Sequence, residues 1–327
     1  MTANKLAKVI QSRFTALIIM SVVVPVMIIL NTYYPHSQHD IEYHHILSTE
    51  AANNEIIKLI TAIINMICFI ATPFIFVIIN RQFRPLKSLT WYFVGLYYII
   101  MLAFPPCYSW SIQGGIISFT VATLTLMLFS LYNRATHQHA TFIIFFICSL
   151  TSLLVTKILF FVPVLIIGIF QMRVFNLKTF CATLLGFITP LWILWGFRII
   201  NPLNIIFSEL NAIGNNTMMN LNSISIISIT LLIVSAIIFF IAIIIKTMSY
   251  NANRRVYNTF LELMTITVIL IMICDYDNIY AYIPTLTVLS SFMSAHIISS
   301  KTHEKEKNII ALIYPLIFIA LTVWNYL

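Results

Sequence analysis

The densest group of side chains able to do chemistry lies within residues 36–45, a segment rich in imidazole and carboxylate groups. Both groups are common ligands of zinc and similar divalent metals. Residues four apart share a helix face, so His36 and Asp40 are expected to converge if this segment is helical. A divalent metal is therefore the one cofactor that the sequence suggests. The candidate metal ligands are His36, His39, His44 and His45, and the candidate catalytic carboxylates are Asp40 and Glu42.

Two other interpretations of this segment stay open. The same groups could serve as acid and base on a lipid-linked substrate at the membrane surface. Alternatively, the histidines face water in an ordinary hydrated loop, since their spacing matches no established zinc signature such as HExxH.

Four further ionisable residues are candidates. Asp275 and Asp277 flank one tyrosine in a short connection, where they could bind a cation or a sugar, or form the local hydrogen bonds of a turn. Glu262 and His296 fall inside apolar segments, and an ionisable residue within a membrane span is a functional candidate by default. The structural alternatives are a carboxylate that reaches the interface and a histidine that makes a hydrogen bond.

The elements that carry these residues follow from composition. Of 327 residues, 60% are hydrophobic and 9% are charged, against roughly 25% charged in a soluble domain. Spans of about 20 apolar residues recur along the chain, and they lack the alternation of barrel strands. We therefore expect an all-α, polytopic transmembrane bundle, as a single integral membrane domain over residues 1–327. Helices are expected near 14–31, 57–79, 88–104, 115–132, 140–155, 158–172, 179–197, 222–245, 257–274, 279–299 and 308–326.

Charge decides between ten and eleven helices. If 140–172 is a tight hairpin turning near Thr156 and Lys157, every basic residue except Lys58, Lys157 and Arg198 falls on one side. If it is a single span, all later segments change sides. The positive-inside rule thus favours eleven helices with a cytoplasmic N-terminus. The same rule accounts for the net charge of +8, so nucleic acid is not an expected partner.

This topology leaves two long external loops, 32–56 and 198–221, and loops commonly carry function. The sequence contains no Walker loop, GxSxG, GxGxxG or HExxH motif, which argues against soluble-type nucleotide chemistry.

Two stretches resemble a known family. The motifs Phe161-Val162-Pro163, Arg173-Val174-Phe175-Asn176-Leu177-Lys178, Leu185-Gly186 and Pro190-Leu191-Trp192 resemble the middle of a domain-of-unknown-function family of bacterial multi-pass inner-membrane proteins. Tyr282-Ile283-Pro284, Ser291 and Ala295-His296 resemble its C-terminal end. The resemblance implies the bacterial inner membrane and supplies no catalytic residues.

Three functions remain open. The first is a non-catalytic subunit or scaffold of a bacterial cell-envelope system, with an envelope protein as partner. The second is a membrane enzyme that acts on lipid-linked glycan at the outer face, by fold-level analogy with multi-pass glycosyltransferases. The third is a transporter or flippase, which the scarcity of intramembrane charge disfavours.

Overall fold

The computed structural model describes residues 12–33, 55–86, 91–108, 114–132, 138–197, 223–247, 250–298 and 304–326. These residues form eleven α-helices and three short 3₁₀ segments, with no strand among them. The α-helices are α2 (Arg13–Tyr33), α4 (Glu55–Phe83), α5 (Tyr92–Leu102), α6 (Gly114–Ser130), α7 (Gln138–Ser152), α8 (Val162–Gln171), α9 (Leu177–Gly196), α11 (Ser223–Thr247), α12 (Ala252–Cys274), α13 (Ile279–Ile298) and α14 (Glu304–Tyr326), and the 3₁₀ segments are η1 (Pro105–Tyr108), η2 (Thr156–Phe161) and η3 (Tyr276–Asn278).

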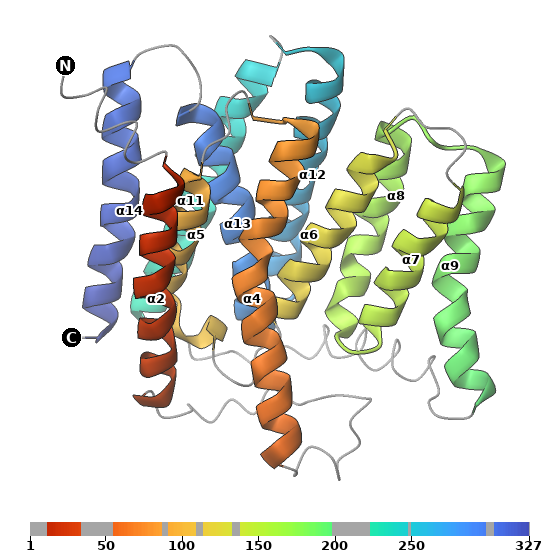
Figure 1. Cartoon of the computed structure of the whole chain (residues 1–327), viewed down its shortest axis with the longest axis horizontal. Helices are drawn as coiled ribbons and strands as arrows, with labels where there is room; N and C mark the ends of the chain where they lie inside the picture. Colours follow the sequence, from red (N-terminus) through yellow and green to blue (C-terminus); the bar gives the residue numbers. More distant parts are fainter. Residues whose placement is uncertain are drawn as a thin grey trace.

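The helices run alternately up and down, so α2 begins at one end of the bundle and α14 finishes at the other (Figure 1). We call the end at which α2 begins the basic end. Lys157, which comes just after α7, lies at the opposite end together with Asp275 and Asp277. The described cationic side chains at the basic end are Arg13, Arg81, Arg84, Arg173, Lys178, Arg254 and Arg255.

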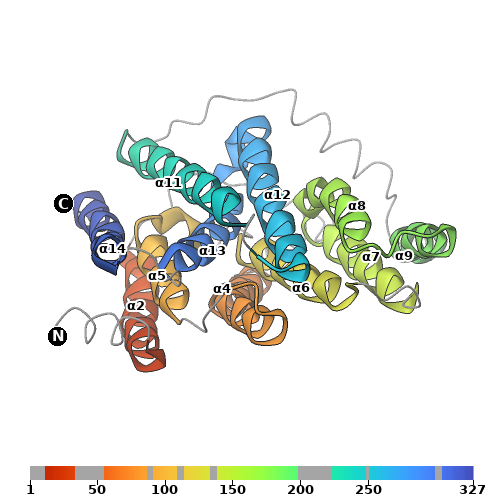
Figure 2. The ribbon, with the colours of Figure 1, turned by 90° about the horizontal axis from the view of Figure 1, so that it is seen from above.

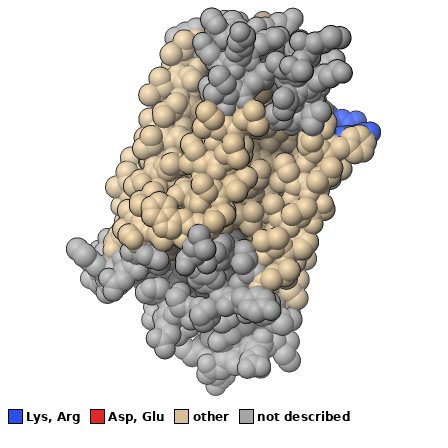
Figure 3. Space-filling model, turned by 90° about the vertical axis from the view of Figure 1, so that its left-hand side faces the viewer, with Lys and Arg blue, Asp and Glu red and all other residues tan. Residues whose placement is uncertain are grey.

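Length and apolar composition make five of the described helices suited to cross a membrane. Six more are apolar but shorter over their described residues, among them α5, whose 11 residues extend about 16 Å at 1.5 Å per residue. On the side shown in Figure 3, the described surface between the two ends is free of charged side chains, and the basic atoms lie near one end. This pattern is typical of a protein surrounded by lipid. The segments suited to cross are Ile63–Phe83, Leu177–Gly196, Ser223–Ile245, Ala252–Cys274 and Tyr276–Ile298.

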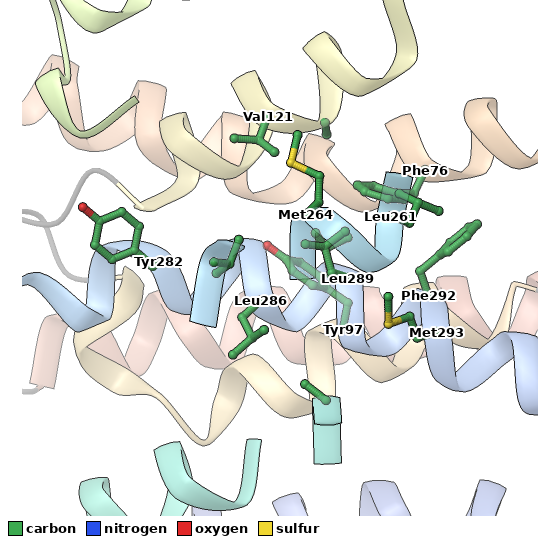
Figure 4. Close-up of a cluster of buried hydrophobic side chains, with 14 of the residues drawn as sticks. Phe76, Tyr97, Val121, Leu261, Met264, Tyr282, Leu286, Leu289, Phe292 and Met293 are labelled. Atoms are coloured by element: carbon green, nitrogen blue, oxygen red, sulfur yellow. The ribbon is translucent and has the colours of Figure 1, made fainter. Parts of the chain in front are cut away.

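Helix α13 forms the centre of the bundle, between α5, α6, α11 and α12 (Figure 2). Its candidate span is 94% buried. Phe292 illustrates the packing, since its ring lies 5.4 Å from Phe76 on α4 and 5.2 Å from Phe93 on α5. Figure 4 shows this core, in which α13 side chains meet residues from the helices on several sides.

Helices α7, α8 and α9 form a wing at one side of the bundle, with α9 at its edge (Figures 1 and 2). Helix α9 packs against α7 at Gly186, where an added Cβ would collide with the backbone carbonyl of Phe142. Close approach therefore depends on a glycine at this position.

The predicted helices are confirmed in number and order within the described residues, with boundaries shifted by a few residues. The division of 140–172 is also confirmed, because α7 ends at Ser152 and η2 and α8 follow. The break begins at Leu153, slightly before the predicted turn. Most of the loops 32–56 and 198–221 lies outside the described residues.

Candidate functional site

The first group of predicted site residues belongs to the segment 36–45. Asp40, Glu42 and the candidate ligands His36, His39, His44 and His45 lie outside the described residues. Among the residues that are described, no group of three or more His, Cys, Asp or Glu side chains is arranged to hold a metal ion. The metal hypothesis therefore remains a prediction for residues 36–45.

Asp275 lies at the junction of α12 and η3 and is 6% exposed. One carboxylate oxygen accepts a hydrogen bond from Asn278 Nδ2 at 2.8 Å, and the other accepts one from the Tyr282 hydroxyl at 2.6 Å. Tyr282 is fully buried in α13, so this carboxylate ties the α12–α13 turn to the central helix. Of the two sequence-based interpretations, the geometry favours the hydrogen bonds of a turn.

Asp277, two residues later, is partly buried and differs from its neighbour. Its Oδ1 atom is buried and has no hydrogen-bond partner among the described residues. Both oxygens of Asp275 thus accept hydrogen bonds from the protein, whereas Oδ1 of Asp277 accepts none from the described residues.

His296 lies near the basic end of α13 and is 1% exposed. Its Nε2 atom is 3.0 Å from Asn258 Nδ2 on α12, and its Nδ1 atom is 3.3 Å from the hydroxyl of Tyr250, in the α11–α12 connection. An amide nitrogen only donates, so Nε2 accepts in this contact. The imidazole therefore joins α13 to α12 and to the connection before it.

Glu262 lies one turn after Asn258 on the same face of α12, because the two are four residues apart. Its Oε1 accepts a hydrogen bond from the Thr247 hydroxyl at the end of α11, at 3.1 Å. Glu262 is 6% exposed, so it makes a buried contact between α12 and α11. Together, Thr247, Tyr250, Asn258, Glu262 and His296 form what we call the basic-end cluster.

Arg254, at the start of α12, places a positive charge near Tyr250 of this cluster. Burial raises the pKa of the Tyr250 hydroxyl, and the nearby Arg254 guanidinium partly counteracts that rise. The phenol is therefore un-ionised near neutral pH and available as a hydrogen-bond partner to His296. The hydrogen bonds of this cluster can hold α11, α12 and α13 together at one end of the bundle.

Sequence reasoning identified Glu262 and His296 but missed Asn258, Tyr250 and Thr247. Asn258 has one signal in the sequence, its four-residue spacing from Glu262 on α12, whereas Tyr250 and Thr247 have none. It also missed Asn65, 3% exposed on α4, whose Oδ1 accepts from the backbone N–H groups of Gly115 and Ile116 at 2.8 and 3.3 Å. That contact supplies a cap for the N-terminus of α6 from another helix.

Comparison with known proteins adds no further constraint. No protein-family model, curated protein or solved structure matches the chain. The functional argument therefore depends on the sequence and on the geometry of the described residues.

Proposed function

We propose that this chain is a bacterial inner-membrane protein that serves as a non-catalytic subunit or scaffold of a cell-envelope system. In this proposal the apolar helices of the bundle lie in the membrane, and the basic end faces the cytoplasm. The positive-inside rule supports that orientation, because the described cationic side chains other than Lys157 lie at one end. The family resemblance of the two internal stretches supports the bacterial inner membrane.

The observation that carries the proposal is the position of α9. Its candidate span is 22% buried, against 94% for α13, and α7 is its main neighbour in the bundle (Figure 2). Helices associate in lipid through packing and hydrogen bonds, with little hydrophobic driving force. A helix with one neighbour leaves much of that packing unused, and a partner helix would supply it. The largest exposed side chains on α9 include Trp192, which is 66% exposed, and Trp195, which is 59% exposed.

The described ionisable candidates support the same function, because they hold helices together. Asp275 fastens the α12–α13 turn, His296 joins α13 to α12, and Glu262 joins α12 to α11. Each contact fixes the shape of the bundle, and a rigid shape is the property that a scaffold needs.

Site-specific photo-crosslinking in intact membranes tests the proposal. A crosslinking amino acid replaces Trp192 on the exposed side of α9, and in a matched variant it replaces Ile238, which is 57% exposed on α11. We expect a discrete protein adduct from position 192 and lipid adducts alone from position 238. Lipid adducts alone from both positions would contradict the proposal.

A parallel experiment addresses the enzyme hypothesis. Asp40→Ala and Glu42→Ala variants, matched for protein level, are expected to keep the wild-type phenotype under the scaffold proposal. If either loses function while the adduct at position 192 persists, a membrane enzyme acting on lipid-linked glycan becomes the better explanation.

A further inference from the structure

A cleft lies between α2, α5 and α14 near the basic end of the bundle. Its volume is about 220 Å³, whereas apolar cavities of roughly 150 Å³ in other proteins bind a molecule as large as benzene. Almost all of its surface is apolar, and it is partly open to the outside of the bundle. Lining residues include Ala16 and Ile19 on α2, Gly95 on α5, and Ala311 and Pro315 on α14.

Small residues create this space. A Cβ added at Gly95 would lie 2.9 Å from Ile19 Cδ1, so the glycine lets α2 and α5 approach closely beside the cleft. The Tyr92 hydroxyl donates to the carbonyl oxygen of Ala311 at 3.1 Å. This bond joins α5 to α14 and so helps to hold α14 in place as one side of the cleft.

One described cation, Arg13, lies at the same end of the bundle as the cleft. Arg13 is exposed at the start of α2, three residues before the lining residue Ala16, so the two are neighbours on one helix face. Helices α2 and α5 both begin at this end, and helix N-termini carry partial positive charge. Trp91, which lines the cleft just before α5, is a residue type that prefers the membrane–water interface.

We propose that this cleft binds one acyl chain of an anionic phospholipid from the leaflet at the basic end, with the lipid phosphate near Arg13. The apolar lining matches a hydrocarbon chain, the side opening admits it from the bilayer, and the cation at the mouth selects the headgroup. The proposal requires only that the bundle lies in a membrane, and it does not depend on the scaffold function.

The lining tryptophan provides a direct test. The full chain is placed in lipid nanodiscs after Trp110, Trp192, Trp195 and Trp324 are each replaced by Phe, which leaves Trp91 as the fluorophore. Phospholipids brominated on the acyl chain quench a nearby indole. We expect brominated phosphatidylglycerol to quench Trp91 at a mole fraction about fivefold lower than brominated phosphatidylcholine, the preference expected of one basic residue near the membrane surface.

Two pairs of variants locate the effect. Leu312→Phe adds bulk at a lining residue and is expected to weaken quenching by both lipids, whereas Ile313→Phe, at an exposed neighbour that does not line the cleft, is expected to leave it unchanged. Arg13→Gln is expected to abolish the preference for the anionic lipid. Arg81→Gln changes an exposed arginine on α4 and is expected to retain that preference.

Equal quenching by the two lipids would overturn the proposal, because Trp91 would then report only bulk bilayer. Weak quenching by both lipids in the parent protein would also overturn it, since a segment of the chain or another protein would then fill the cleft. The arginine pair leaves the core untouched, so the headgroup preference stays testable even if Leu312→Phe does not fold.

Discussion

The hydroxyl of Tyr97 on α5 donates a hydrogen bond to the backbone carbonyl oxygen of Phe69 on α4, over 3.3 Å. Phe69 comes four residues before Pro73, which lies inside α4 and has no N–H to donate to that carbonyl. The adjacent Tyr98 donates to the carbonyl of Ile70 at 2.8 Å. Two consecutive tyrosines on one helix therefore satisfy the backbone acceptors next to a proline on its neighbour.

The same four-residue relationship recurs at one other proline, and near a third proline a hydroxyl bonds a carbonyl three residues before it. The Tyr92 hydroxyl on α5 bonds the carbonyl of Ala311, four residues before Pro315 on α14. The Ser149 hydroxyl on α7 bonds the carbonyl of Phe187, three residues before Pro190 on α9, at 2.7 Å. An unpaired backbone carbonyl is costly in hydrocarbon, and neighbouring helices commonly relieve that cost.

A double-mutant cycle tests this pairing. Tyr97→Phe is expected to lower the free energy of unfolding by about 1 kcal/mol, the usual range for hydrogen bonds between membrane helices. In a Pro73→Ala background the same change is expected to cost less, because residue 73 then supplies its own N–H to Phe69. Unfolding by denaturing detergent, followed by circular dichroism, provides the measurement.

Tyr132→Phe is the matched control, since the Tyr132 ring packs on Tyr257 and its hydroxyl bonds none of the described residues. Its stability should be close to that of the parent. An equal cost for Tyr97→Phe with and without Pro73 would show that the hydroxyl acts independently of the proline.

A pair of glycines on α9 tests the attachment of the wing. Gly186→Val places side-chain atoms where the Phe142 carbonyl lies, and it is expected to separate α9 from α7 and raise the protease sensitivity of the wing. At Gly196 nothing lies within 4 Å of an added Cβ, so Gly196→Val is expected to behave like the parent. Limited proteolysis in mild detergent compares the two variants, and equal sensitivity would argue against close α7–α9 packing.

The Asp275–Tyr282 bond is expected to contribute to stability. Tyr282→Phe removes the donor to a buried carboxylate oxygen, and a hydrogen bond to a charged group is worth about 1.5–3 kcal/mol. Asp275→Ala with Tyr282→Phe is expected to cost less than the two changes added together, because they remove one shared bond. Full additivity of the unfolding free energies would be inconsistent with that bond.

Orientation is tested by labelling single cysteines in intact cells, in a chain lacking its five native cysteines. Lys157→Cys is expected to react with a membrane-impermeant maleimide added outside, and Lys178→Cys is expected to react only after the membrane is permeabilised. The two residues lie at opposite ends of the bundle. Labelling of both from the same side would contradict the hairpin topology.

The helices could be predicted from the sequence because apolar runs and charge position are local properties of the chain. The break before Thr156 was predictable since charge distribution depends on the number of helices, whatever their packing. The partners of His296 were not predictable, because Asn258 and Tyr250 meet it only once α12 lies beside α13. The prolines at 73, 190 and 315 can be read from the sequence. The hydroxyls that donate to the carbonyls before them cannot, because they depend on which helices become neighbours.

The proline contacts also have a consequence for biosynthesis, because a chain enters the membrane from its N-terminus. When α9 and α14 are inserted, their hydroxyl donors Ser149 and Tyr92 have already been synthesised. For α4 the order is reversed, since Tyr97 and Tyr98 follow Pro73 along the chain. Helix α4 therefore enters the membrane before Tyr97 can donate to the Phe69 carbonyl that Pro73 leaves without a donor, which favours the release of α4 and α5 into lipid as a joined hairpin.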